Sequence, residues 1–308
     1  MELLGNKLIV ANTGSDSISI IDIDNHSLSD TIHLSESMKI KDKTTYNGPY
    51  VGPHHICFRE NNIVYSANSY NNSVYKINID TKKTEDIVFV GSFPSHLVCH
   101  NGLIFVTNSD SNSISVIEEK GFNLIENIPV GERPHDIKLD KISNKLYISN
   151  NNGHSVDVID LTISNQKKIK LQYNPVHVIV EDDIMFVLSP PSNGMVDSKL
   201  VIYSLKEEKT IKVIDMPGVI VDMVILEDKE RAYVTNVEDG NLYEMDLVKY
   251  KIKHKYNIGG MPNNILRKNN ELIFSDPLNN RVVIFNYIQS QVVWSIDVGI
   301  EPNGLIII

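Results

Sequence analysis

Seven copies of one β-rich unit predict an all-β fold, a seven-bladed β-propeller with four antiparallel strands in each blade. Three observations support this prediction. One strand motif recurs seven times, a proline that opens an apolar run also recurs seven times, and the two ends of the chain carry complementary parts of one unit. Repeats of about 40 residues built from short strands are typical of propeller blades.

The first marker is a short β-rich segment that ends in a small polar residue. Successive copies begin 39 to 56 residues apart. The seven copies are IVAN at 9–12, YSAN at 65–68, FVTN at 105–108, YISN at 147–150, FVLS at 186–189, YVTN at 233–236 and IFSD at 273–276.

The second marker shares this period and consists of Pro53, Pro94, Pro134, Pro175, Pro217, Pro262 and Pro302. Each unit has room for four strands, as in 134–140, 145–150, 155–161 and 166–173. Alternating apolar residues and β-branched side chains favour strands, and clusters of Asn, Gly, Ser and Asp between them favour turns. No stretch sustains a helical period.

The two chain ends predict how the ring closes. Residues 302–308 resemble a first strand with nothing after it, whereas the chain begins at a second strand with nothing before it. We therefore expect the last strand to complete the N-terminal blade, which makes residues 1–308 a single domain. Closure of this kind removes open sheet edges that would invite aggregation.

Composition narrows the functional classes. The chain has 42% hydrophobic and 22% charged residues, ordinary values for a globular protein. Its net charge is −10, and its 29 basic residues are scattered along the sequence, so we expect no nucleic-acid partner. No run of about 18 apolar residues predicts a membrane span. The N-terminus shows neither a basic leader nor an apolar run with a cleavage site, so the expected location is cytoplasmic.

The two cysteines are expected to be buried free thiols. Cys57 and Cys99 occupy neighbouring but unequal positions of two units, so their side chains should leave opposite faces of their strands. A disulfide between them is therefore not expected.

Chain direction places the candidate site on one face of the ring, which we call the top face. Each innermost strand starts after its proline at this face, and the second strand returns to it. The residues after the prolines therefore meet at the mouth of the central channel. The predicted ligand-binding residues are His54, His55, His96, His135, Asp136, His177, Asp222, Asn264 and Asp276.

Three interpretations of this ring of polar residues stay open. The side chains could satisfy backbone groups at the strand ends, or they could bind a small polar or anionic molecule or a peptide. Alternatively, three histidines with Asp136 or Asp222 could hold a transition metal, since imidazole is the commonest metal ligand. No local metal-binding motif supports the third interpretation, so no cofactor is assigned and a divalent metal is only an alternative.

The sequence resembles the YVTN β-propeller repeat family. The segment YVTN at 233–236 is the motif that names this family, and VGERPH at 130–135 and VGIEP at 298–302 are similar to its blade junctions. The resemblance covers essentially the whole chain. It implies the propeller fold but no single activity, because this scaffold carries many functions.

Virginiamycin B lyase, a metal-dependent propeller, is the nearest enzyme that the chain resembles. In that family a histidine follows a blade proline, which His54 and His135 match, and a glutamate lies near the end of a second strand. The strand ends here carry no glutamate, and an amide cannot accept the proton. Only Asp276 could substitute, so the resemblance to the lyase is incomplete.

The sequence thus favours a non-enzymatic recognition propeller that binds a small polar ligand, a peptide or a protein at the top face. Two departures from the repeat, residues 35–51 and 189–198, lie on that face, and Tyr46, Tyr50 and Tyr70 would add contact surface. The alternative is a metal-assisted lyase or hydrolase that uses the same histidines. No serine-hydrolase, phosphate-loop or cysteine motif supports other chemistry.

Overall fold

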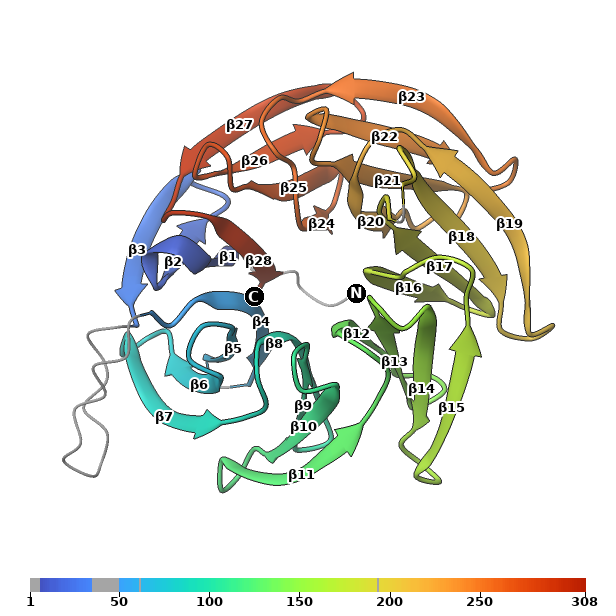
Figure 1. The fold of residues 1–308 in the computed structure, drawn as a ribbon. Coiled ribbons are helices and arrows are strands. Elements are labelled where there is room, and N and C mark those ends of the chain that lie inside the picture. Colours follow the sequence, from blue (N-terminus) through green and yellow to red (C-terminus); the bar gives the residue numbers. More distant parts are fainter. Residues whose placement is uncertain (1–5, 35–49, 61, 193) are drawn as a thin grey trace.

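A computed structural model describes residues 6–34, 50–60, 62–192 and 194–308. Seven four-stranded antiparallel sheets are arranged radially around a central axis, with one innermost and one outermost strand in each sheet (Figure 1). The predicted seven-bladed β-propeller is therefore confirmed.

Each blade runs from its innermost to its outermost strand, and the bounds are as follows. Blade 1 contains β28 (Pro302–Ile307), β1 (Lys7–Asn12), β2 (Ser17–Asp22) and β3 (Ser27–His33), with a short 3-10 helix η1 (Thr13–Ser15) between β1 and β2. Blade 2 contains β4 (Pro53–Arg59), β5 (Ile63–Asn68), β6 (Ser73–Asn78) and β7 (Lys83–Phe89). Blade 3 contains β8 (Pro94–His100), β9 (Leu103–Asn108), β10 (Ser113–Glu118) and β11 (Asn123–Pro129). Blade 4 contains β12 (Pro134–Asp140), β13 (Lys145–Asn150), β14 (Ser155–Asp160) and β15 (Asn165–Lys170).

The remaining blades follow the same order. Blade 5 contains β16 (His177–Glu181), β17 (Ile184–Ser189), β18 (Ser198–Ser204) and β19 (Lys209–Met216). Blade 6 contains β20 (Ile220–Ile225), β21 (Arg231–Asn236), β22 (Asn241–Asp246) and β23 (Lys251–Asn257). Blade 7 contains β24 (Ile265–Lys268), β25 (Glu271–Asp276), β26 (Arg281–Asn286) and β27 (Gln291–Asp297).

The ring closes as expected within blade 1. Strand β28 pairs antiparallel with β1, and Leu8 lies opposite Ile307. The backbone N–H of Ile308 donates to the carbonyl of Lys7 at 2.9 Å. Because this sheet contains both ends of the described chain, hydrogen bonds rather than a covalent link complete the ring.

The hydrophobic core lies between neighbouring blades. One cluster, for example, combines Tyr65 and Val74 of blade 2 with Leu97 and Ile104 of blade 3, all at most 3% exposed. Apolar residues therefore cover both faces of each sheet, which explains why the second and third strands consist largely of buried side chains.

The polar residue that ends each second strand is buried and has a structural role. In four blades the side-chain Nδ2 of this asparagine donates to a serine hydroxyl at the start of the third strand, from Asn12, Asn68, Asn108 and Asn150 to Ser17, Ser73, Ser113 and Ser155. Asn150 also donates to Oδ2 of Asp157 at 2.9 Å. The amide thus fixes the turn between the two strands at the top face.

Replacing Asn150 with alanine should lower the free energy of unfolding by about 1–3 kcal/mol, because Ser155 and Asp157 lose a buried donor. Urea denaturation measures this change. The matched control is Asn152→Ala, because the Asn152 side chain is exposed and makes no hydrogen bond within the described residues. Equal stability of the two variants would contradict the assigned role.

The prediction that the cysteines are free thiols is wrong. Cys57 in β4 and Cys99 in β8 form a disulfide, with their Cα atoms 6.8 Å apart. Cys57 lies opposite Tyr65 and Cys99 lies opposite Ile104, one step apart within their units, so their side chains leave opposite faces of equivalent sheets. In a ring, however, the two surfaces that meet between neighbouring blades are opposite faces of equivalent sheets. Because the two cysteines lie one step apart within their units, both sulfur atoms point into the space between blades 2 and 3.

The structure tests the expectations about the long link and about membrane spans only for the described residues. Residues 35–49 of the long link, including Tyr46, lie outside the described residues, whereas Tyr50 and Tyr70 are 63% and 50% exposed. Within the described ranges, no helix is both long and apolar enough to cross a membrane. The cytoplasmic location stays a prediction, and the disulfide is a feature more common in oxidising compartments.

Candidate functional site

The histidines lie at the top ends of four consecutive innermost strands. In β4, β8 and β12 the pairing register shifts at this point, between Pro53 and His55, Pro94 and Leu97, and Pro134 and Ile137. Each shift leaves an extra residue outside the ladder, and such bulges re-aim side chains. Strand β16 begins directly at His177.

These side chains surround a cavity at the mouth of the central channel, which we call the axial funnel. Its volume is about 130 Å³. The lining residues are His54, His55, His96, His135, Val176, His177, Val221, Asn263, Asn264 and Asn303. All five predicted histidines and Asn264 therefore line one site, and they come from five different blades.

Three imidazole rings form a compact triangle at the centre of the funnel. The ring centroids are 4.8 Å apart for His96 and His135, 5.2 Å for His135 and His177, and 5.1 Å for His96 and His177. His55 stacks on His96 at 4.3 Å. The triangle is thus held by ring contacts as well as by the strands.

The triangle has the donor set of a metal site. One ring nitrogen from each of His96, His135 and His177 lies within 4.8 Å of the other two. Imidazole binds zinc at about 2.0–2.1 Å, which places neighbouring nitrogens about 3.3 Å apart around a tetrahedral ion. Small rotations of the three rings would close this gap. The Nδ1 atom of His135 is buried and has no hydrogen-bond partner within the described residues.

Asp136 lies behind the triangle rather than in its lining. Its side chain is fully buried, with Oδ1 3.0 Å from Nδ1 of His96 and Oδ2 3.8 Å from Nδ1 of His177. The backbone N–H of Val178 donates to Oδ2 at 3.0 Å. A carboxylate behind metal-binding imidazoles is the usual means of orienting the rings and raising their basicity.

Lys138, which the sequence did not predict, lies against Asp136 behind the funnel lining. Its Nζ lies 3.4 Å from Oδ1 of Asp136. Burial acts to lower the pKa of Lys138, but Asp136 and Asp222 outweigh it and raise that pKa. Burial likewise acts to raise the pKa of Asp136, yet Lys138 and the nearby imidazoles hold it well below its usual range. Alternation from Asp136 along β12 could have indicated Lys138, since residues two apart share a face.

The imidazoles of His54, His55, His96 and His135 are neutral at neutral pH. Burial lowers the pKa of His54 to about 4 and that of His55 to about 3. Burial is also the main reason that the pKa values of His96 and His135 lie well below the usual value, with the neighbouring rings adding to the effect. Each of these four rings therefore keeps a nitrogen lone pair available as an acceptor.

The other predicted carboxylates have structural partners. Oδ2 of Asp222 accepts hydrogen bonds from Nδ2 of Asn264 at 2.8 Å and from the N–H of Ile265 at 3.0 Å. Asp276 does not line the funnel. It is buried at the end of β25, where it accepts hydrogen bonds from Arg281 and from the N–H of Met261.

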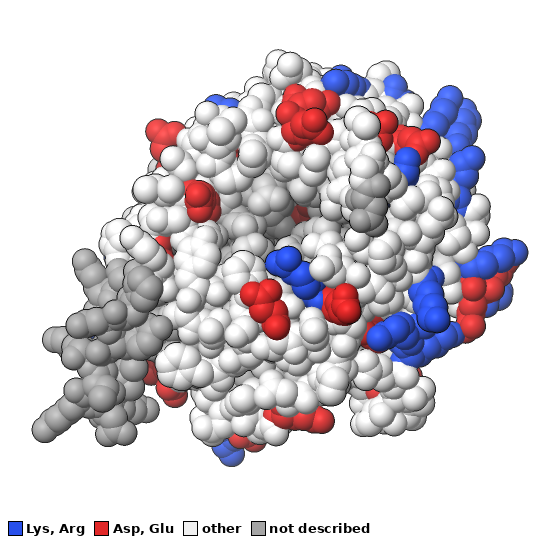
Figure 2. All heavy atoms as spheres, viewed as in Figure 1, with Lys and Arg blue, Asp and Glu red and all other residues white. Residues whose placement is uncertain are grey.

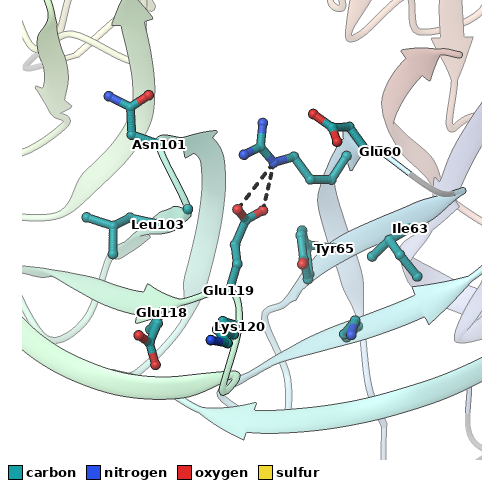
Figure 3. Close-up of a pocket in the computed structure, with 11 residues that line it drawn as sticks. Glu60, Ile63, Tyr65, Asn101, Leu103, Glu118, Glu119 and Lys120 are labelled. Atoms are coloured by element: carbon teal, nitrogen blue, oxygen red, sulfur yellow. Dashed lines mark hydrogen bonds and ion pairs between the residues drawn. The ribbon is translucent and has the colours of Figure 1, made fainter.

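A larger cavity lies at the opposite ends of the strands, between blades 2 and 3 (Figure 3). Its volume is about 570 Å³, and its lining includes Glu60, Tyr65, Glu118 and Lys120. Its central charges are already paired, because Nε of Arg59 donates to both carboxylate oxygens of Glu119 at 3.0 and 3.2 Å. The axial funnel, with its unpaired imidazole nitrogen, is therefore the stronger candidate despite its smaller size.

The fold and the site together define a seven-bladed β-propeller with a histidine-lined axial funnel. No model of a known protein family and no curated protein matches the chain, so membership of the YVTN family stays a prediction.

Solved structures with the same fold are numerous. A functionally unknown protein from Desulfotomaculum acetoxidans is 13% identical, with a TM-score of 0.77 and 98% of each chain covered. Hydrazine synthase from Kuenenia stuttgartiensis is 17% identical, with a TM-score of 0.74 over 87% of this chain and 91% of that chain. AztD from Citrobacter koseri is 15% identical, with a TM-score of 0.63 over 99% and 98%. At these identities the likeness supports the fold alone.

The low pKa values predict that the metal-free protein loses stability in weak acid. In the unfolded chain His54 and His55 take up protons below about pH 6.5, whereas in the folded protein they do so only near pH 4 and 3. The contribution of these two neutral rings to the free energy of unfolding is complete above about pH 6.5 and falls as the pH drops toward 4. Thermal unfolding measured across this range should show a steep decline.

The variant His54→Gln/His55→Gln should flatten this decline, since glutamine does not titrate. The titratable groups that face these two rings are unchanged in the variant, and they are His96, His135, Asp136, Lys138 and His177. His33→Gln, at an exposed position, serves as the control. An identical pH profile for all three proteins would show that these two rings are not buried in the neutral form.

Proposed function

We propose that this protein is a binding propeller whose axial funnel takes up a divalent transition-metal ion. The observation that carries this proposal is the convergence of His96, His135 and His177, with one nitrogen of each within 4.8 Å of the others. These residues come from three blades, so only the closed ring assembles the site.

The chemistry of the funnel favours a cation over the other ligands considered. Neutral imidazoles present lone pairs, which attract cations, whereas binding of an anion would require the protonated form that burial disfavours. A volume of about 130 Å³ is also small beside the roughly 300–1,000 Å³ of typical small-molecule pockets. A peptide or protein partner at the top face stays a separate prediction.

The donor set also selects among metals. Imidazole nitrogens suit zinc, copper, nickel and iron, whereas calcium and magnesium prefer oxygen ligands. We therefore expect Zn²⁺ or Ni²⁺ to bind and Mg²⁺ not to bind.

The variant His96→Ala/His135→Ala/His177→Ala should lose Zn²⁺ and Ni²⁺ binding, because it removes all three proposed ligands. Titration calorimetry on untagged, metal-stripped protein measures this loss. The control variant His33→Ala removes a histidine outside the funnel and should bind as the parent protein does.

The result can oppose the proposal in two ways. No binding of Zn²⁺ or Ni²⁺ by the parent protein would overturn the metal assignment. Failure of the triple variant to fold would support the interpretation that the histidines satisfy strand-end groups, and single substitutions at His135 then separate folding from binding.

Replacing Lys138 with methionine should strengthen Zn²⁺ binding by about tenfold, because it removes a positive charge 3.4 Å from Asp136 that repels the incoming ion. The same titration measures the change. Lys141→Met alters the net charge equally at an exposed position and should have little effect. Weaker binding by Lys138→Met would mean that Lys138 supports the site rather than opposing a cation.

A metal-assisted lyase or hydrolase is the second candidate. Three protein ligands leave coordination positions open, which is typical of catalytic zinc sites. We place this candidate second because Asp136 and Asp222 accept hydrogen bonds from backbone N–H groups, which stabilise the charged carboxylate and make it a weaker base.

A further inference from the structure

The outer wall of the propeller has a strongly uneven charge distribution. The outermost strands of blades 4, 5 and 6 carry eight lysines and a single acidic residue, Asp215. The eight lysines are Lys167, Lys168, Lys170, Lys209, Lys212, Lys251, Lys253 and Lys255. The outermost strands of the other four blades carry one lysine and five acidic residues.

These lysines form one continuous surface, which we call the basic wall. Strands β15, β19 and β23 follow one another along the circumference in Figure 1, and the lysines and arginines in Figure 2 gather along the same side. Lys167 of β15 pairs with Glu208, in the turn before β19, so the neighbouring blades are in contact here. All eight lysines are exposed. The basic residues that look scattered in the sequence are thus concentrated by the fold.

Part of this charge has no carboxylate partner among the described residues. Lys167, Lys168, Lys209, Lys253 and Lys255 each lie near a carboxylate. Lys170, Lys212 and Lys251, one in each outer strand, make no ion pair within the described residues. The single acidic residue of these strands, Asp215, is paired with Lys199.

Protection of the sheet edges does not account for the pattern. Lysines on edge strands do prevent edge-to-edge aggregation. The other outer strands occupy the same position, yet β11 and β27 expose apolar residues such as Ile125 and Val292 instead. A general need for edge protection would have placed lysines on all seven blades.

We propose that the basic wall binds an acidic, extended polypeptide segment of a partner protein. The charges are complementary, and the outer edges of β15, β19 and β23 offer backbone N–H and C=O groups that an extended segment could pair with. The whole protein carries a net charge of −10. At physiological ionic strength, however, salt screens charges more than about 8 Å away, so a segment bound at the wall interacts mainly with the nearby lysines.

Nucleic acid and membranes fit the wall less well. The eight lysines come without an arginine on these strands, whereas arginine is the residue suited to bidentate phosphate contacts. The wall is also convex, since it follows the circumference of the ring, so a flat bilayer would touch only part of it (Figure 1).

The test measures binding of a fluorescently labelled oligoglutamate peptide to the full chain by anisotropy. The parent protein should bind at physiological ionic strength and more weakly as further salt is added. The variant Lys170→Glu/Lys212→Glu/Lys251→Glu should weaken binding by at least about tenfold, because it reverses three unpaired charges. These substitutions break no ion pair within the described residues, and thermal unfolding checks that the fold is retained.

The matched control is Lys83→Glu/Lys120→Glu/Lys141→Glu, which changes the net charge equally at exposed positions outside the wall. It should weaken binding by no more than about twofold. An equal loss in both variants would show that only net charge matters and would overturn the proposal. The proposal would also fail if the parent protein bound no oligoglutamate, or bound duplex DNA or anionic vesicles more tightly than the peptide.

Discussion

The pairing of β28 with β1 is the contact on which the rest of the structure depends. It completes blade 1 and so fixes the positions of all seven sheets around one axis. The three central histidines come from blades 3, 4 and 5 and share no local sequence motif. Their proximity is a property of the closed ring, because each strand alone would present a single imidazole with no partner.

The fold could be predicted because its cause is periodic. The marker residues at the ends of the second strands recur, and their burial and hydrogen bonds to the following serines explain why they do. The cysteine prediction failed for a geometric reason. Alternation does place the two side chains on opposite faces of equivalent sheets, but in a ring these are the two surfaces that meet between neighbouring blades, and they join Cys57 to Cys99.

The candidate site could be predicted only in part. Positions after the blade prolines located the five histidines and Asn264 in one funnel, since the same slot recurs in each unit. Position after a proline does not distinguish residues that line the funnel from residues behind the lining, so the prediction placed Asp136 and Asp222 together with the histidines. The prediction also included Asp276, which caps a turn. Lys138 was not predicted because it lies beyond the positions that directly follow the blade proline, although its place two residues after Asp136 on β12 puts both side chains on one face of the strand.

Ring closure by the final strand has a consequence for how the protein is made. The N–H of Ile308 and the carbonyl of Lys7 form a hydrogen bond, so the last described residue is needed beside one of the first. During synthesis the other strands emerge before β28. Until β28 follows, β1 lacks the strand that pairs with its inner edge, and blade 7 lacks one of the surfaces against which it packs. The propeller can close only after β28 has left the ribosome, and until then the nascent chain keeps an open strand edge that chaperones could shield.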